Sequence, residues 1–566
     1  MSSAATTRPS TTGEWGTALT TTEVGGVTFR VYAQRAYDVA DTLTFADRWG
    51  DRPHIVQDER VITFAQLTAA VRAKASTLGA AGTARGDRVV LVGFNSPDWI
   101  VNFWAVLTLG AVPVLANAWW SGEEMGEAFA TLRPALVLAD NRAATRLPEG
   151  YEIGPWPCVI PEGEAPPPAP ASGSYENTPA VVIFTSGTSG RPKAVVLTHR
   201  SLLAGLHMLL HITERLPHQV TDTSGSPVLH TGPMFHIGGI QTLLRAVVVG
   251  DTLVMPRGRF EPAEALELIE TWQVTRWSAV PTMVSRVLEH PDVAVRTLTS
   301  LRSLTVGGAP VQGAFLARLR VGFPGIQPRV ATGYGLTENG GQATAASGRD
   351  TLERPGNSGR ALPCVELRIV ATGETAFGEI LLRSPTQMQG YSGELDSPID
   401  SDGWLHTGDL GRVDDDGYLW ITGRSKDLII RGGENVSPAA VEAALDALPG
   451  VVESVVFAVP HNDLGEEVMA VVSVTEGETP ESLRDQLAGR LASFAIPTRW
   501  QLIWETLPVN HSGKIDKPAI AAAARASLPG ESGPAARGHW SARIGTAPWR
   551  SSKCTAHQAI FSTATC

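Results

Sequence analysis

Short apolar runs alternate with helical patterns along the first part of the chain. Residues 88–93 (RVVLVG) form an apolar run with β-branched side chains, which is typical of a strand buried on both faces. A helical spacing of apolar residues follows at 96–109, opened by Ser96 as a cap and Pro97 in the first turn. Residues 111–115 (AVPVL) predict the next strand, so this stretch indicates a βαβ unit.

The alternation returns in the middle of the chain, where the pattern predicts two helices that are each followed by a strand. The helices are expected at residues 260–273 and 281–290, and the strands at 275–280 and 301–306. Repeated alternation of this kind is typical of parallel sheets with helices on both faces. We therefore predict the α/β class, with a large N-terminal domain of mainly parallel sheets flanked by helices.

A smaller unit begins near Gly423. Its pattern predicts helices at residues 437–448, 481–494 and 517–527, and strands at 451–459 and 468–474. This is an α+β module of about a hundred residues, a normal domain size. It belongs to a chain of 566 residues, which is too long for a single core. The expected domains are residues 1–422 and 423–528, followed by a terminal segment, 529–566.

The terminal segment differs in composition from the rest of the chain. Residues 531–566 show neither a helical nor a strand period, and they hold one acid against four bases. Their formal charge is therefore +3, which leaves −14 for the remainder of a chain whose net charge is −11. We expect this tail to be disordered and dispensable; the alternative is a basic arm that binds an acidic carrier or a membrane surface. Residues 161–174, rich in Pro and Ala, predict a surface loop.

Composition and charge narrow the classes of function. The negative net charge argues against a nucleic-acid partner and against an anionic membrane held by charge alone. The longest apolar stretch, residues 104–120, is broken by Gly110, Pro113 and Asn117, and the N-terminus does not read as a signal peptide. We therefore expect no transmembrane segment. The four cysteines form no metal or redox pair, which favours a reducing cytoplasm. They are Cys158, Cys364, Cys554 and Cys566.

The segment with the clearest chemistry is 185–199 (TSGTSGRPKAVVLTH), which follows the apolar run 180–184. Its row of small and hydroxyl-bearing residues lets backbone N–H groups converge on phosphate oxygens, and Lys193 adds positive charge. A Walker A loop would need Ser or Thr after the lysine and a helix to follow, whereas Ala194 and a β-branched run follow here. A flexible linker is the alternative, but two strand-like runs bracket the segment.

This segment resembles the phosphate-binding loop of the adenylate-forming superfamily, which includes the acyl-CoA synthetases and AMP-dependent acid:CoA ligases. Ala194 departs from the glycine that is usual there. Further segments resemble the family in its order, and the match runs from about Asp38 to Ala524. They are PMFHIGG (233–239), GGAP (307–310), ATGYGLTE (331–338), GWLHTGD (403–409), GRSKDLIIRGGENVSP (423–438) and PVNHSGKIDK (508–517).

The resemblance implies a ligase that uses ATP to convert a carboxylic acid to acyl-AMP, releases pyrophosphate, and then transfers the acyl group to CoA. The acid and the α-phosphate are both anions, so the attack needs cations and fixed donors. By resemblance, Lys514 reaches both anions from a mobile C-terminal domain, and Glu338 with Thr188 binds Mg²⁺, which prefers hard oxygen ligands. His236 is expected at the mouth between the acid site and the thiol tunnel; an ordinary partly buried histidine is the alternative.

The resemblance also implies a nucleotide site. Asp409 would accept both ribose hydroxyls, Arg424 would add a donor, and Tyr334 would offer an aromatic face to adenine. The full nucleotide and phosphate set is Thr185, Ser186, Gly187, Thr188, Ser189, Gly190, Lys193, Gly308, Ala309, Pro310, Tyr334, Gly335, Thr337, Asp409 and Arg424. The hinge is expected at Lys426, and thiol binding at Gly432, Gly433 and Glu434. The acyl pocket is expected at His236, Gly239, Gly307, Gly333 and Gly340.

The residue after Phe235 bears on the substrate. Family members that activate amino acids commonly carry an aspartate there as a counter-charge for the buried ammonium, whereas this chain has His236. Small neutral pocket residues and the segment NAWWSGE (117–123) favour a medium- or long-chain fatty acid, with an aryl acid next. The expected acceptor is CoA. The alternatives are a free-standing adenylation enzyme that loads an acyl carrier protein, and a non-catalytic nucleotide-binding relative.

His207 and His211 lie four residues apart on a predicted helix, which is a spacing that metal ligands use. No third ligand is near them in the sequence, and their segment, SLLAGLHMLLHI, is strongly apolar. We therefore interpret both histidines as packing residues.

Overall fold

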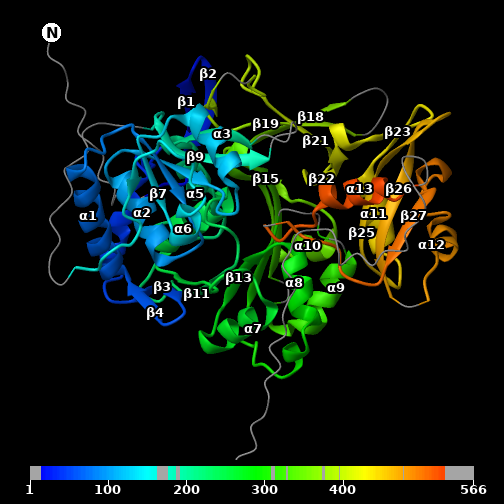
Figure 1. The fold of residues 1–566 in the computed structure, drawn as a ribbon, viewed down its shortest axis with the longest axis horizontal. Helices are drawn as coiled ribbons and strands as arrows, with labels where there is room; N and C mark the ends of the chain where they lie inside the picture. Colours follow the sequence, from blue (N-terminus) through cyan, green and yellow to red (C-terminus); the bar gives the residue numbers. More distant parts are fainter. Residues whose placement is uncertain are drawn as a thin grey trace, which may run out of the picture.

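The computed structural model describes residues 15–161, 176–186, 192–307, 311, 313–326, 329–371, 377–393, 396–475, 477–510 and 512–528. Most of the expected loop after Pro161, residues 187–191 of the phosphate segment, residues 308–310 and the terminal segment 529–566 lie outside them. Figure 1 shows a large N-terminal part and, at one end of the molecule, a smaller C-terminal part drawn in yellow to orange.

The first of two large sheets contains the predicted βαβ unit. Its strand order is β20-β10-β9-β6-β5-β7-β8. The strands are β5 (Arg88–Val92), β6 (Val112–Ala116), β7 (Leu136–Ala139), β8 (Ile153–Gly154), β9 (Pro179–Ser186), β10 (Pro192–Thr198) and β20 (Gly390–Tyr391). β5 and β6 pair in parallel, and α2 (Pro97–Thr108) connects them. Ser96 caps α2 by accepting the Trp99 N–H at 3.1 Å, so the predicted start of this helix is confirmed.

The second large sheet has the order β17-β16-β15-β14-β13-β11-β12-β3-β4. Its strands are β3 (Pro53–Gln57), β4 (Arg60–Thr63), β11 (Pro227–His230), β12 (Thr252–Val254), β13 (Arg276–Ala279), β14 (Ser303–Val306), β15 (Val330–Leu336), β16 (Gly341–Ala346) and β17 (Arg360–Ala361). The central strands β11, β13, β14 and β15 are parallel. The helices beside this sheet are α1 (Phe64–Ala80), α6 (Ile237–Val249), α7 (Pro262–Thr271), α8 (Pro281–Glu289) and α9 (Gly313–Gly322), whereas α5 (His199–Ile212) packs on β9 and β10 of the first sheet. The α/β class is therefore confirmed.

One apolar cluster joins the two sheets. It contains Leu91 of β5, Trp104 of α2, Leu243 of α6 and Leu253 of β12, all of them buried. Burial of side chains of this size contributes about 1.5–3 kcal/mol each, which holds the two sheets and their loops in one arrangement. Among the described residues, no helix has the length and apolar character needed to cross a bilayer.

A third, antiparallel sheet was not predicted from the sequence. It comprises β18 (Glu366–Ala371), β19 (Gly378–Arg383), β21 (Leu405–Val413) and β22 (Leu419–Arg424), in that order. A separate hairpin is formed by β1 (Leu19–Val24) and β2 (Val27–Tyr32).

The C-terminal part is the predicted α+β unit, although one helix is shorter than predicted and three of its strands were not predicted. Its sheet has the order β24-β23-β26-β25, with β27 paired to β26. The elements are β23 (Ile429–Arg431), β24 (Glu434–Val436), α11 (Pro438–Asp446), β25 (Val451–His461), β26 (Gly465–Val474), α12 (Pro480–Leu487), β27 (Arg499–Ile503) and α13 (Lys517–Ala526). The helix predicted to reach residue 494 ends at Leu487, because Ala488 is extended and Gly489 has φ +82°. The strands that were missed are β23, β24 and β27.

Buried histidines lie in the N-terminal core. The His54 ring has its centroid 4.1 Å from that of Phe64, and its Nδ1 lies 3.0 Å from the Asp251 carbonyl. Burial lowers the pKa of His54 to about 4 from its usual 6.5. Between these values the unfolded chain binds a proton that the folded protein does not, so this histidine makes the folded state less stable as the pH falls through that range.

We expect His54→Asn to weaken this pH dependence. Asparagine retains an N–H that can reach the Asp251 carbonyl, but it does not titrate in this range. The melting temperature should fall less between pH 7 and pH 5 in the variant than in the wild type, even if lost packing lowers it at pH 7. The full effect of one such histidine is about 1.4 kcal/mol per pH unit. If the melting temperature fell equally in both proteins, the lowered pKa of His54 would be contradicted.

Candidate active site

The carboxyl ends of the parallel strands meet at one edge of the second sheet. The segment bearing His236 follows β11, α8 follows β13, Gly307 follows β14, and Glu338 follows β15. Parallel strands bring the residues that follow them to the same edge, which is where open α/β sheets bind their ligands. Residues that are far apart in the sequence therefore gather at one place.

The phosphate segment lies on the adjacent first sheet. β9 and β10 pair antiparallel, with Thr185 opposite Lys193 and Ser186 opposite Pro192. The residues between these strands, including Gly187, Thr188, Ser189 and Gly190, lie outside the described part of the chain. The Lys193 ammonium lies 4.9 Å from the centroid of the Tyr391 ring, a cation–π distance.

Glu338 links the two large sheets. Its Oε1 lies 3.2 Å from the Tyr391 hydroxyl of β20 and 3.4 Å from the Thr185 hydroxyl of β9, and both hydroxyls donate to it. Burial and the charge of Glu338 raise the pKa of Tyr391, so the phenol stays protonated as a donor. Sequence reasoning missed Tyr391, since only the pairing of β20 with β10 brings it here.

Asp409 and Arg424 are cross-strand partners on β21 and β22. Arg424 Nε donates to Asp409 Oδ1 at 2.8 Å, and the Tyr334 hydroxyl donates to Asp409 Oδ2 at 2.6 Å. Burial, followed by the negative charge of Asp409, raises the pKa of Tyr334. Each carboxylate oxygen has a second lone pair, so the buried Asp409 can still accept a further hydrogen bond.

Lys514 projects from a tight turn of the C-terminal part. The Asn510 N–H donates to the Lys514 carbonyl at 2.7 Å, and the Lys514 N–H donates to Asn510 Oδ1 at 3.1 Å. The residue Lys514 is exposed as a whole, but nearby protein atoms partly desolvate its ammonium group. This desolvation, and then the charge of Arg424, lowers the pKa of Lys514. Burial and the charge of Lys514 lower the pKa of His236 to about 4, so His236 is neutral at neutral pH. Lys514, Arg424 and His236 therefore share one neighbourhood.

Aromatic rings continue from His236 into the N-terminal part. The ring centroids of His236 and Phe235 are 4.7 Å apart, those of Phe235 and Trp119 are 5.7 Å apart, and those of Trp119 and Phe94 are 5.0 Å apart. Trp119 belongs to the segment NAWWSGE. This row offers apolar surface beside the strand edge.

The glycines expected to line an acyl pocket fall into two groups. A Cβ at Gly239 would come 2.7 Å from the Met234 backbone, and those at Gly333 and Gly340 would meet the carbonyls of Thr344 and Thr386. These three glycines permit close packing of the protein itself. A Cβ at Gly307 would meet no described atom within 4 Å.

The remaining expected residues lie in turns or beside the site. Gly335 permits close approach of the Gly341 carbonyl, and the Thr337 carbonyl accepts the Gly340 N–H at 2.9 Å. Lys426 is exposed between β22 and β23. Gly432 and Gly433, with φ of +60° and +90°, form the exposed turn that leads into Glu434. Gly308, Ala309 and Pro310 lie outside the described residues.

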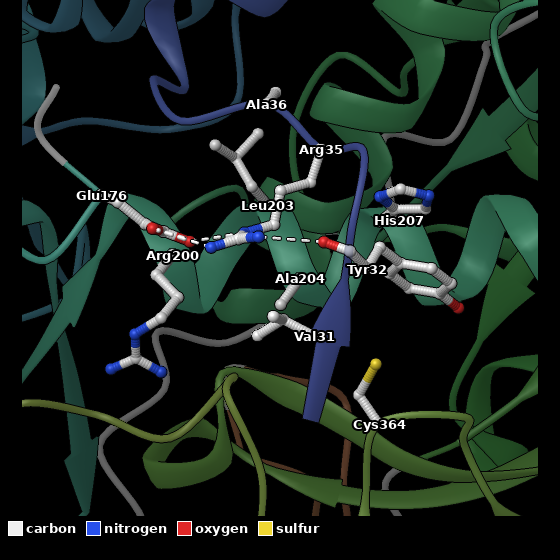
Figure 2. A pocket seen from close by; sticks show the side chains of 10 residues that line it. All are labelled: Val31, Tyr32, Arg35, Ala36, Glu176, Arg200, Leu203, Ala204, His207 and Cys364. Carbon is white, nitrogen blue, oxygen red and sulfur yellow. Dashed lines mark hydrogen bonds and ion pairs between the residues drawn. The ribbon is translucent and has the colours of Figure 1, made fainter. Parts of the chain in front are cut away.

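A small cavity beside α5 is too small for a substrate. Figure 2 shows Arg35 between Glu176 and the Tyr32 carbonyl, with the Tyr32 ring against His207. The ring centroids of Tyr32 and His207 are 3.7 Å apart, and the Tyr32 hydroxyl lies 2.9 Å from His211 Nδ1. The space is about 10 Å³, enough for about one water molecule. Both histidines pack against the Tyr32 ring, as the apolar segment predicted.

Comparisons with known proteins agree with this arrangement. Residues 43–392 match the AMP-binding enzyme family, and residues 440–514 match the AMP-binding enzyme C-terminal domain. The chain is 32% identical to the fatty acid–[acyl-carrier-protein] ligase ScoC of Streptomyces coeruleorubidus, over 86% of this chain and 96% of that one. It is 30% identical to the indoleacetate–CoA ligase of Aromatoleum aromaticum, over 81% and 92%. The solved O-succinylbenzoate CoA synthetase (MenE) of Bacillus subtilis, in complex with ATP and magnesium, superimposes with a TM-score of 0.71 at 27% identity, over 85% of this chain and 99% of that one.

The two kinds of glycine predict different consequences of adding a methyl group. Gly340→Ala places a side chain at φ +62° against the Thr386 carbonyl, so it should lower the free energy of unfolding by about 1–3 kcal/mol. Gly307→Ala meets no described atom within 4 Å and should change it by less than about 0.5 kcal/mol. Urea unfolding of both variants measures the difference. Equal losses would show that Gly307 is also packed.

Proposed function

Because the chain belongs to the AMP-binding enzyme family, we propose that it is a ligase that joins a carboxylic acid to AMP and then passes the acyl group to the thiol of CoA. The observation that carries this proposal is the position of Lys514. A lysine from the C-terminal part lies close enough to His236 and Arg424 to share charge interactions with both, at the strand edge that also bears Glu338.

In the first half-reaction, an oxygen of the acid attacks the α-phosphorus of ATP, and the bond to pyrophosphate breaks. The ammonium of Lys514 offsets the repulsion between the two anions and stabilises the charge that develops on the phosphate oxygens. Lys193 and the hydroxyl of Thr185 approach the phosphates from the first sheet. Asp409 and Arg424 hold the ribose, and Tyr334 keeps Asp409 in place through its hydroxyl.

The site fits a magnesium ion that enters with ATP. Glu338 offers a hard carboxylate oxygen beside the hydroxyls of Thr185 and Tyr391, and Mg²⁺ commonly uses one or two carboxylates plus substrate phosphates. Glu338 and Thr188 would hold the ion. When bound, it would neutralise phosphate charge. The role of Tyr391 is to orient the carboxylate of Glu338.

In the second half-reaction, the thiol attacks the acyl carbon and AMP leaves. One closed geometry serves both steps poorly, so the C-terminal part turns at Lys426 and presents Gly432, Gly433 and Glu434 to the thiol. His236, neutral and at the border between Lys514 and the aromatic row, separates the acid site from the thiol entrance.

Two observations support a fatty or aryl acid as the substrate. Phe235, Trp119 and Phe94 provide apolar surface next to His236, and no acidic residue follows Phe235 to pair with an amino group. The two relatives described above are named for a fatty acid and for indoleacetate.

The free thiols of Cys158 and Cys364 suit a reaction in the cytoplasm.

A carrier protein is the second candidate for the acceptor. The relative ScoC, which this chain matches over most of its length, is named as a ligase of acyl carrier protein. Thioester formation assayed in parallel with CoA and with a phosphopantetheinylated carrier protein separates the two acceptors.

We expect Lys514→Ala to separate the two half-reactions. Acid-dependent release of pyrophosphate should fall by at least ~100-fold, the scale of losing one charge-stabilising group. Thioester formation from supplied acyl-adenylate and CoA should survive, because that step no longer joins two anions. Both rates are measured on the same preparation of the variant, so survival of the second half-reaction shows that the variant is folded. Equal losses in the two half-reactions would contradict the role of Lys514.

A further inference from the structure

The first turn of α8 contacts the loop that carries Lys514. The Thr282 hydroxyl donates a hydrogen bond to the Gly513 carbonyl, the residue immediately before Lys514. Gly513 has φ +79°, and a Cβ there would lie 2.6 Å from Met283 Cε and 3.5 Å from Val280 Cγ2. The loop therefore fits against α8 both through a hydrogen bond and through close packing. Figure 1 shows α8 next to the C-terminal part.

The surface that receives Gly513 is held rigidly by the N-terminal core. The Trp277 indole N–H donates to the Thr231 hydroxyl at 3.0 Å, and that hydroxyl lies 3.5 Å from Met283 Sδ. All three residues are buried. Because Trp277 is on β13 and Thr231 directly follows β11, the place of Met283 is set by the same strands that set the strand edge of the active site.

A charged side chain lies one helical turn further along α8. Residues four apart share a face of a helix, so Arg286 stands on the same side as Thr282. Burial raises the pKa of Glu453 on β25; the Leu507 N–H and then the charge of Arg286 oppose this rise, whereas the charge of Glu289 adds to it. Glu453 Oε2 in turn accepts the Leu507 N–H at 3.0 Å, at the start of the Lys514 loop. The loop is thus held at Gly513 by α8 and at Leu507 by Glu453 of β25.

We propose that Thr282 is a positioning residue for the first half-reaction, which places the ammonium of Lys514 by docking Gly513. It acts through the loop and touches neither acid nor nucleotide. The contact exists only while the C-terminal part stands against α8, so it favours acyl-adenylate formation and has no place in the step that follows domain rotation. This inference rests on the proposed function, in which Lys514 serves the first step alone.

The test compares Thr282→Val, which keeps the shape but removes the hydroxyl, with Thr282→Ser, which keeps the hydroxyl. Acid-dependent pyrophosphate release without thiol measures the first half-reaction, and thioester formation from supplied acyl-adenylate and CoA measures the second. Thr282→Val should slow the first about three- to tenfold, as expected for one lost hydrogen bond, and leave the second unchanged. Thr282→Ser should stay near the wild type in both.

Gly513→Ala is a second probe, on the opposite side of the contact and outside the N-terminal core. Its added methyl group meets Met283, so it should also slow the first half-reaction selectively. It keeps the test decisive if Thr282→Val fails to fold. Unchanged pyrophosphate release in the folded variants, or equal losses in both half-reactions, would overturn the inference.

Lys514→Ala, assayed together with Thr282→Val and Gly513→Ala, separates the docking role of Thr282 from the proposed role of Lys514. If Lys514→Ala loses pyrophosphate release while Thr282→Val and Gly513→Ala keep it, the docking role fails and the proposed function stands. If Lys514→Ala keeps pyrophosphate release, the role of the lysine itself fails, and the docking role fails with it.

Discussion

The proposed chemistry depends on bringing two anions together, a carboxylate and a phosphate. Two like unit charges 4 Å apart repel each other by about 1 kcal/mol in water and by about 4 kcal/mol at the lower effective dielectric near a protein surface. The site therefore needs positive charge that stays in place while solvent is displaced. Among the described residues, the proposed site draws its positive charge from Lys193 on the first sheet, Arg424 on the third sheet, and Lys514 on the C-terminal part. The packing of separate sheets against one another is what brings them together.

Because Lys514 belongs to the C-terminal part, the contacts between that part and α8 must be specific enough to place the lysine and weak enough to break. In the proposed reaction, Lys514 must stand accurately over the strand edge for one step and leave it for the next. The contacts at α8 suit this compromise: one hydrogen bond to Gly513 and one close packing contact with Met283. Such contacts fix a position at a modest cost in free energy to break, whereas a large apolar interface would hold the domain in one state.

Helices and strands that depend on neighbouring residues could be predicted from the sequence. Contacts between residues far apart in the chain could not. The strand at 88–93 and the cap at Ser96 depend on neighbouring residues, and both are confirmed. The prediction of a helix that reaches residue 494 is wrong. It followed the apolar spacing and gave too little weight to Gly489, a residue that favours the end of a helix. Tyr391 and Thr282 could not be found, because strand pairing and domain docking bring them to Glu338 and Gly513. The glycines near the acid site were expected to give room for a substrate, yet a Cβ at Gly333 or Gly340 would meet protein atoms.

In the proposed reaction, an oxygen of the acid attacks the α-phosphorus. This step is tested most directly by following that oxygen. The acid is labelled with ¹⁸O in both carboxyl positions and converted with ATP and CoA, and the products are analysed by mass spectrometry. Attack on the α-phosphorus followed by thiol attack on the acyl carbon predicts one labelled oxygen in AMP and none in pyrophosphate. Label in pyrophosphate or orthophosphate, or unlabelled AMP beside an acyl-CoA product, would contradict it.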